Sequence, residues 1–268
     1  MRRSFVLLLA VAALIVAMVA PASAVKNGEL DGEDHPHVVL ILMEVDGEPA
    51  YRCSGTLIAS TYVLTAGHCT SNYPDGEFSG IRIFTESDVQ NGDNSYPFAG
   101  NNSVEAVEWA SHPDYETAPF FVHDVGMIEL AEPVVLDEYG ALPGADQLDV
   151  MKTMRGKQDT TFTAVGYGLQ YINPKFVEAE KIRMVANPRL IQINTPGFTG
   201  DFSLLLSNNH ATGGTCFGDS GGPNFLGDTN VVAGVTSFGL NGNCAGTGGV
   251  FRMDRQNVLD FVNGFMQE

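Results

Sequence analysis

The chain has 268 residues with 14 basic and 32 acidic side chains, which give a formal net charge of −18. An acidic chain of this kind argues against nucleic acids and anionic membranes as partners. Its length is enough for one large all-β unit or two small packed units, each with a sizeable core.

The first 24 residues have the pattern of a secretory signal peptide. Arg2 and Arg3 precede an apolar run over residues 5–20, and Pro21 and small residues lead to Ala24. A membrane anchor is the alternative, but the run is shorter than the ~20 apolar residues that a spanning helix needs. We therefore expect cleavage after residue 24 and a secreted protein, extracellular or periplasmic, that does not contact the membrane once the signal is removed.

Short runs rich in β-branched and aromatic residues, separated by Gly, Pro, Asn and Asp, dominate the rest of the chain. They fall into two sets of six, in residues 25–131 and 160–253, joined by a Pro- and Gly-punctuated connection at 132–159. Two such sets are consistent with two antiparallel barrels, and a binding site is expected in the cleft between them. The predicted strands are residues 38–43, 56–58, 62–65, 81–85, 104–109, 125–130, 161–165, 181–185, 204–207, 224–226, 231–237 and 249–253.

Residues 254–268 predict a terminal helix. Val258, Phe261, Val262 and Phe265 form an apolar stripe at helical spacing, and Asp254 precedes them as an expected N-cap. We interpret the stripe as a packing face rather than a binding face.

Four cysteines in an exported chain predict two disulfide bonds. Cys53, Cys69, Cys216 and Cys244 allow three pairings, and their number does not decide among them. None of them belongs to a Cys-x-x-Cys metal-binding motif.

Three short motifs point to nucleophilic catalysis. Ser220 lies in the glycine-lined segment 216–223, His68 precedes a cysteine in segment 65–69, and Asp124 opens an apolar run. A serine hydroxyl is a poor nucleophile near neutral pH and needs a base to take its proton. A histidine, oriented by a carboxylate, is the side chain suited to that role.

These motifs, in the order His, Asp, Ser and at domain-scale spacing, resemble those of the chymotrypsin/trypsin-type serine peptidases. The resemblance covers nearly everything after residue 24. It implies two antiparallel six-stranded β-barrels with a C-terminal α-helix, and a serine endopeptidase that cleaves proteins or peptides through an acyl-enzyme. It also implies disulfides Cys53–Cys69 and Cys216–Cys244, and protein inhibitors as further partners.

The resemblance assigns roles to individual residues. Ser220 is the expected nucleophile, His68 the general base and Asp124 the group that orients the imidazole, with Ser237 supporting the carboxylate. The N–H groups of Gly218 and Ser220 are the expected oxyanion hole. A peptidase-like protein that binds without cleaving is the alternative, but all three triad residues are intact.

The family's activation step involves an ion pair, which here would join Asp219 to the amino terminus of Val25. Ala24, rather than a basic residue, precedes Val25. We therefore expect removal of the signal itself to create the activating ammonium, without a separate propeptide.

The resemblance also locates the substrate pocket. Gly214 stands where trypsin-like enzymes carry an aspartate, and Gly239 and Gly249 match two wall positions. An open, deep pocket without a counter-ion predicts a preference for large apolar or aromatic residues before the scissile bond. A glutamate-preferring peptidase is the alternative because Thr215 can hold a carboxylate, but Thr236 stands where a histidine would be expected. The residues assigned to the pocket are Gly214, Thr215, Phe217, Ser237, Phe238, Gly239 and Gly249.

No metal or other cofactor is expected. Asp75 and Glu77 follow His68 in a loop where some relatives bind calcium. Calcium takes about 6 to 8 oxygen ligands, and two carboxylates fall well short of that number.

Overall fold

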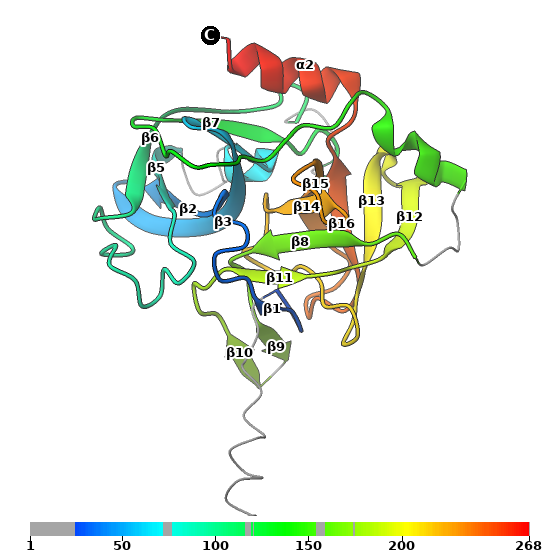
Figure 1. Ribbon diagram of the computed structural model, residues 1–268, viewed down its shortest axis with the longest axis horizontal. Coiled ribbons are helices and arrows are strands. Elements are labelled where there is room, and N and C mark those ends of the chain that lie inside the picture. The colour runs from blue at the N-terminus through cyan, green and yellow to red at the C-terminus, as the bar shows by residue number, and fades with distance from the viewer. Residues whose placement is uncertain are drawn as a thin grey trace, which may run out of the picture.

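The structure, a computed structural model, describes residues 25–71, 77–115, 119, 121–153, 159–173 and 175–267. The predicted signal peptide and Asp75 therefore lie outside the described residues. Within them a β-barrel and a larger sheet lie side by side, and a helix crosses one end of the molecule (Figure 1).

Six strands of the first half form a closed antiparallel barrel with the order β2-β3-β4-β7-β6-β5. Strand β2 is buried on both faces because alternate side chains point to opposite sides of a strand. Val39 and Ile41 pack inside the barrel, whereas Val38 and Leu40 pack against the neighbouring sheet. The six strands are β2 (Val38–Val45), β3 (Glu48–Ala59), β4 (Tyr62–Thr65), β5 (Phe78–Phe84), β6 (Ser103–Ser111) and β7 (Gly126–Leu130).

Seven strands of the second half and β1, from the start of the described chain, form an eight-stranded sheet with the order β1-β11-β8-β14-β15-β16-β13-β12. All twelve predicted strands are present, and the all-β fold class is confirmed. The second set contains eight hydrogen-bonded strands rather than the six expected, because β1 and β12 join its edges. The strands of this sheet are β1 (Glu29–Leu30), β8 (Phe162–Gly166), β11 (Met184–Ala186), β12 (Leu190–Thr195), β13 (Gly200–Asn208), β14 (Pro223–Leu226), β15 (Val232–Gly239) and β16 (Gly246–Arg252).

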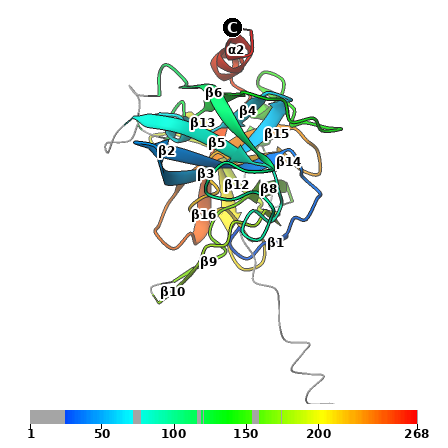
Figure 2. The ribbon, with the colours of Figure 1, turned by 90° about the vertical axis from the view of Figure 1, so that its left-hand side faces the viewer.

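A two-stranded hairpin projects from the body of the protein (Figure 2). It pairs β9 (Tyr171–Asn173) with β10 (Phe176–Glu178), and the side chains of Tyr171, Phe176 and Val177 are exposed. The sequence pattern did not predict these strands.

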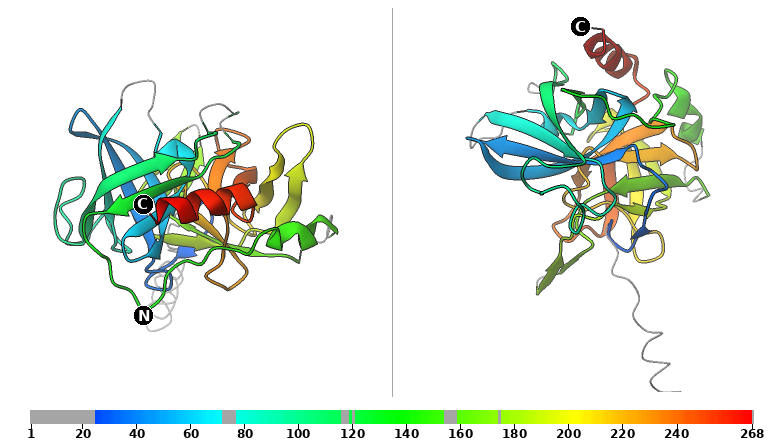
Figure 3. Two further views of the ribbon diagram at one scale, coloured as in Figure 1. Left: turned by 90° about the horizontal axis from the view of Figure 1, so that it is seen from above. Right: turned by 60° about the vertical axis from the view of Figure 1, so that its left-hand side comes forward.

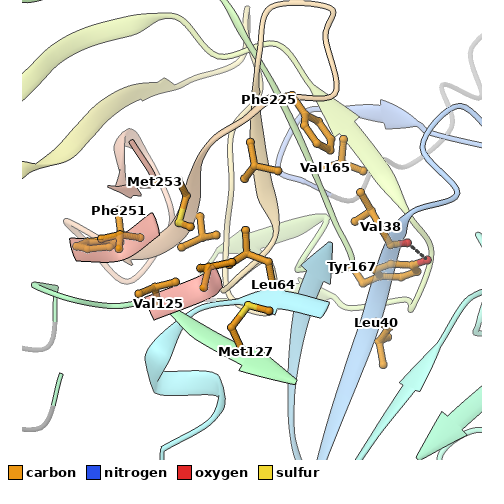
Figure 4. Packing of buried hydrophobic residues seen from close by; sticks show 14 of the residues in the cluster. Val38, Leu40, Leu64, Val125, Met127, Val165, Tyr167, Phe225, Phe251 and Met253 are labelled. Carbon is orange, nitrogen blue, oxygen red and sulfur yellow. Dashed lines mark hydrogen bonds between the residues drawn. The ribbon is translucent and has the colours of Figure 1, made fainter. Parts of the chain in front are cut away.

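The barrel and the sheet share a buried core, shown in Figure 4. Val38 and Leu40 of the barrel lie in the same cluster as Val165 and Phe225 of the sheet. Tyr167 crosses the boundary, and its hydroxyl donates a hydrogen bond to the Val38 carbonyl at 3.3 Å. This continuous packing fixes the position of the barrel loops relative to the sheet loops.

Arg183 adds a polar connection across the same boundary. Its Nε donates to Asp31 at 2.8 Å and its Nη1 to the Val38 carbonyl at 3.1 Å, and both charged side chains are fully buried. A buried ion pair needs such hydrogen bonds because desolvation of its charges is costly.

The C-terminal helix α2 (Gln256–Phe265) is confirmed and lies across one end of the molecule (Figure 3). Val258, Val262 and Phe265 of the predicted stripe are buried. The predicted cap is wrong: the N-cap residue is Arg255, without a side-chain hydrogen bond. Asp254 instead accepts the N–H of Leu148 and pairs with Arg252, because the buried guanidinium competes for this carboxylate.

Both disulfides pair as expected. Cys53 on β3 is bonded to Cys69 on the 3₁₀ helix η1 (Gly67–Cys69), and Cys216 is bonded to Cys244. A second 3₁₀ helix, η2 (Gln147–Thr153), lies between β7 and β8 in the chain. Among the described residues, the helices are too short and too polar to pass through a membrane.

Candidate active site

Asp124 is fully buried just before β7 and accepts several hydrogen bonds. The backbone N–H of His68 donates to Oδ1 at 2.9 Å, and Nδ1 of His68 lies 3.0 Å from Oδ2. The hydroxyl of Ser237 on β15 donates to the same Oδ2 at 2.5 Å. A buried carboxylate requires such donors, and this one orients the imidazole with its Nδ1–H toward Asp124.

His68 is held in place by its own local structure. It lies on η1, and the disulfide of the next residue, Cys69, ties this turn to β3. Burial of the imidazole opposes protonation, but the charge of Asp124 and its hydrogen bond outweigh burial and raise the pKa of His68.

Ser220 lies in the turn before β14, and strands from both halves of the molecule bind this turn. Ser54 of β3 donates its N–H to the Ser220 carbonyl at 2.8 Å and its hydroxyl to the Gly218 carbonyl at 2.9 Å. On the other side, the N–H of Gly221 donates to Thr236 of β15 at 2.8 Å. Gly218 has φ of +96°, a conformation that favours glycine.

His68 and Ser220 line one cavity of about 400 Å³. The structure thus brings the histidine of the barrel and the serine of the sheet to a shared cleft. Five of the seven predicted pocket residues also line this cavity, namely Thr215, Phe217, Ser237, Phe238 and Gly239. Cys216, Thr236 and Cys244 complete its lining.

The other two pocket residues, Gly214 and Gly249, lie behind side chains and do not line the cavity. A Cβ atom on Gly214 would lie 2.5 Å from Cγ of Asn208, and one on Gly249 would lie 2.3 Å from the Phe238 ring. The space beside both glycines is therefore filled. Gly249, one of the two glycines expected to leave the pocket wall open, therefore has the Phe238 ring beside it.

A group of three phenylalanines adjoins the cavity and was not identified from the sequence. The Phe238 ring centroid lies 5.6 Å from that of Phe121 and 5.8 Å from that of Phe198, and Phe121 and Phe198 are 4.6 Å apart. Phe198 is 47% exposed, so the group offers an apolar surface to a ligand. These residues come from separate loops and strands, and no local motif connects them.

Asp219 is fully buried behind the serine turn. It accepts hydrogen bonds from the N–H groups of Gly168 and Cys216, both at 2.8 Å. Burial raises the pKa of Asp219 to about 7, against the effect of these donors and of the Arg52 charge. Val25 is also fully buried.

Within the part of the chain that the structure describes, two groups of side chains have ligand atoms close enough to be considered for a metal ion. In the first, Cys53 and Cys69 form a disulfide and are not available beside His68. In the second, His112, Asp114 and His123 have ligand atoms within 4.8 Å of one another, but Nδ1 of His112 accepts the backbone N–H of Asp114. We assign no metal to either group, and Glu77 of the calcium hypothesis is exposed.

A barrel and a sheet that bring a buried Asp–His pair and a serine to one cleft have the arrangement of the chymotrypsin-like serine proteases. The family model described as Trypsin matches residues 27–262, and the chain belongs to this family.

Curated relatives agree with this assignment. The chain is 29% identical over 233 residues to the venom serine protease Bi-VSP of Bombus ignitus, covering 82% of this chain but 61% of that longer protein. It is 28% identical over 205 residues to glandular kallikrein-10 of Rattus norvegicus, covering 70% of this chain and 71% of the kallikrein. The solved structure of HL collagenase has a TM-score of 0.68 at 21% identity over 91% of this chain and 99% of the collagenase, which supports the fold alone.

Proposed function

We propose that the protein is a secreted serine endopeptidase that hydrolyses peptide bonds of proteins or peptides through an acyl-enzyme. The observation that carries the proposal is the 3.0 Å contact between His68 Nδ1 and buried Asp124, on a histidine that lines one cavity with Ser220. Two disulfides suit a protein of an oxidising, extracytoplasmic compartment.

In the proposed reaction, the Ser220 oxygen attacks the substrate carbonyl while His68 takes the hydroxyl proton. Asp124 stabilises the resulting imidazolium, and the N–H groups of Gly218 and Ser220 bind the oxygen that becomes negative. When the C–N bond breaks, His68 gives the proton to the departing amine. Water then attacks the ester in the same way, so that the acid product leaves and Ser220 is regenerated.

The direct test is turnover of a peptide substrate by the wild type and the Ser220→Ala variant. Removing the nucleophile should lower kcat by about 10⁶-fold. The matched control is Ser79→Ala, an exposed serine of β5, which should keep wild-type turnover. A wild-type protein that binds the peptide without cleaving it would support the alternative of a non-catalytic binding protein.

For specificity, we propose a preference for large apolar or aromatic side chains before the scissile bond. The Phe238 ring lines the cavity, and the lining residues of the described chain include no lysine or arginine to neutralise a glutamate. A panel of tetrapeptides that differ only at this position provides the test. Cleavage after Phe, Tyr or Leu should be at least about tenfold faster than after Arg, Lys or Glu, and the reverse order would contradict the proposal.

We also propose that the ammonium of Val25 forms an ion pair with Asp219 once residues 1–24 are removed. Val25 is buried, and the carbonyl of the next residue, Lys26, accepts the N–H of Gly214 at 3.1 Å. Gly214 is five residues before Asp219 in the chain, so this hydrogen bond holds the start of the described chain near the segment that carries Asp219. Sequencing the amino terminus of the active secreted protein tests this proposal. An active species that begins upstream of Val25, or well downstream of it, would contradict it.

A further inference from the structure

Arg52 lies beside the turn that carries Gly218 and Ser220. It belongs to β3, two residues before Ser54, which binds the backbone of this turn. A Cβ atom on Gly218 would lie 3.2 Å from Nε of Arg52. Arg52 does not line the 400 Å³ cavity, so its guanidinium borders the reaction site outside the pocket.

The Arg52 side chain is half-buried, and its charge acts on the buried carboxylate of Asp219 without a direct contact to it. Within the described part of the chain, its guanidinium donates one hydrogen bond, from Nη1 to the Ala179 carbonyl at 3.3 Å, and forms no ion pair within 4.0 Å. Arg82, Arg183 and Arg252 are more buried, and each pairs with a carboxylate. Because a guanidinium has five N–H donors, Arg52 retains donors for a ligand.

Lys181 contributes a second positive charge near Arg52. Its ammonium lies 5.9 Å from the centroid of the Tyr96 ring. Burial, followed by the charge of Arg52, lowers the pKa of Lys181, and Glu180 opposes this effect. The two cations therefore repel each other, and an anion bound beside them would reduce that repulsion.

The course of a bound substrate relates these cations to specificity. The side chain before the scissile bond fills the cavity, and the carbonyl oxygen binds at Gly218. The leaving group takes its proton from His68 of the barrel, so it departs on the barrel side, where β3 carries Arg52. We propose that Arg52 is a specificity-determining residue that binds an aspartate or glutamate side chain within the first two residues after the scissile bond. The inference rests on the proposed endopeptidase function and extends it to the leaving-group side.

The test uses internally quenched peptides that share all residues before the scissile bond. Each carries Glu, Gln or Lys at the first or the second position after it. At one of these positions the wild type should cleave the Glu peptide about tenfold faster than the Lys peptide in kcat/KM, as a charge-assisted hydrogen bond allows. High salt should narrow the ratio, because screening weakens an exposed ion pair.

Variants assign this preference to the side chain. Arg52→Gln should bring the Glu-to-Lys ratio close to one, and Arg52→Lys should retain part of it. The matched control is Arg189→Gln, an exposed arginine that does not line the cavity and should keep the wild-type ratio. Equal cleavage of the Glu and Lys peptides by the wild type, or a ratio that survives in Arg52→Gln, would overturn the inference.

A binding measurement separates this inference from the proposed function. If the wild type cleaves no peptide, the endopeptidase proposal fails, but affinities of the same peptides for the Ser220→Ala variant still test Arg52. Tighter binding of the Glu peptide that disappears when Arg52→Gln is added supports the role of Arg52. Equal affinities, or a difference that persists, contradict it.

Discussion

Two aspartates, Asp124 and Asp219, are both fully buried but have different surroundings. Asp124 faces the ring of His68 and the hydroxyl of Ser237. Asp219 accepts two backbone N–H groups, and burial raises its pKa to about 7. A positive charge beside a buried carboxylate favours its ionised form. The charge of Arg52 already acts on Asp219 against the effect of burial, and in our proposal the ammonium of Val25 adds a second positive charge once residues 1–24 are removed.

Of the two aspartates, Asp124 is expected to have the larger effect on turnover when it is replaced. Asp124→Asn keeps the size of the side chain, but its amide would donate toward Nδ1 of His68 and favour the wrong imidazole tautomer. Turnover should fall by about 10⁴-fold. The control is Asp114→Asn, an exposed aspartate outside the triad, and initial rates on one peptide substrate compare the variants. A loss of less than about tenfold in Asp124→Asn would mean that this carboxylate does not orient the base.

Asp219 should make stability depend on pH in a protein that retains a short extension before Val25, because this protein has no ammonium group at Val25. The ordinary pKa of aspartate is 3.8, and burial raises that of Asp219 to about 7. The folded state therefore binds more protons between these values, and its free energy of unfolding should fall by about 4 kcal/mol as the pH rises through this window. The form that begins at Val25 should lack this loss.

Urea unfolding of the two forms near pH 5 and near pH 8 measures the difference directly, because their other titrating groups are the same. The extended form should lose more stability than the mature form on going to the higher pH. Equal losses in both forms would remove the reason to pair Val25 with Asp219.

His37 should make the free energy of unfolding depend on pH in the opposite direction, and by a smaller amount. It is buried, and burial, followed by the charges of His35 and Arg183, lowers its pKa from 6.5 to about 4. The unfolded chain binds the proton more tightly, so the free energy of unfolding should fall by about 3 kcal/mol as the pH drops from about 6.5 to about 4.

The variant His37→Leu should remove this acid sensitivity. Neither ring nitrogen of His37 has a hydrogen-bond partner in the described structure, so a leucine leaves no polar group unpaired. His210→Gln, at an exposed histidine, serves as the control. The two variants should differ in the pH dependence of their urea midpoints, and identical dependence would assign the acid sensitivity to other groups.

Features that depend on short stretches of sequence could be predicted. The strands of the barrel follow runs such as 38–43, and the disulfide pairs follow from the family resemblance carried by the motifs around His68 and Ser220. Strand β12 was missed although residues 190–193 include three apolar side chains, because its pairing with β13 is interrupted by register shifts. Strand β1 has two exposed residues and exists through its pairing with β11.

The pocket could not be predicted in the same way, because side chains from distant segments determine its shape. Gly214 and Gly249 were assigned to the pocket, but neither lines the cavity, and Asn208 and Phe238 occupy the space beside them. Arg52 was also missed, since its position beside Gly218 arises only from the packing of the barrel against the sheet.

Covalent labelling tests directly whether His68 activates Ser220 as a nucleophile. A fluorophosphonate should modify the wild-type protein at Ser220, located by mass spectrometry of the proteolytic peptides, because only a serine activated by a base reacts readily with it. The label should be lost in His68→Ala and retained in Ser79→Ala. A wild-type protein that remains unlabelled would contradict the assignment of Ser220 as the nucleophile. A label on Ser220 that persists in His68→Ala would contradict the assignment of His68 as its base.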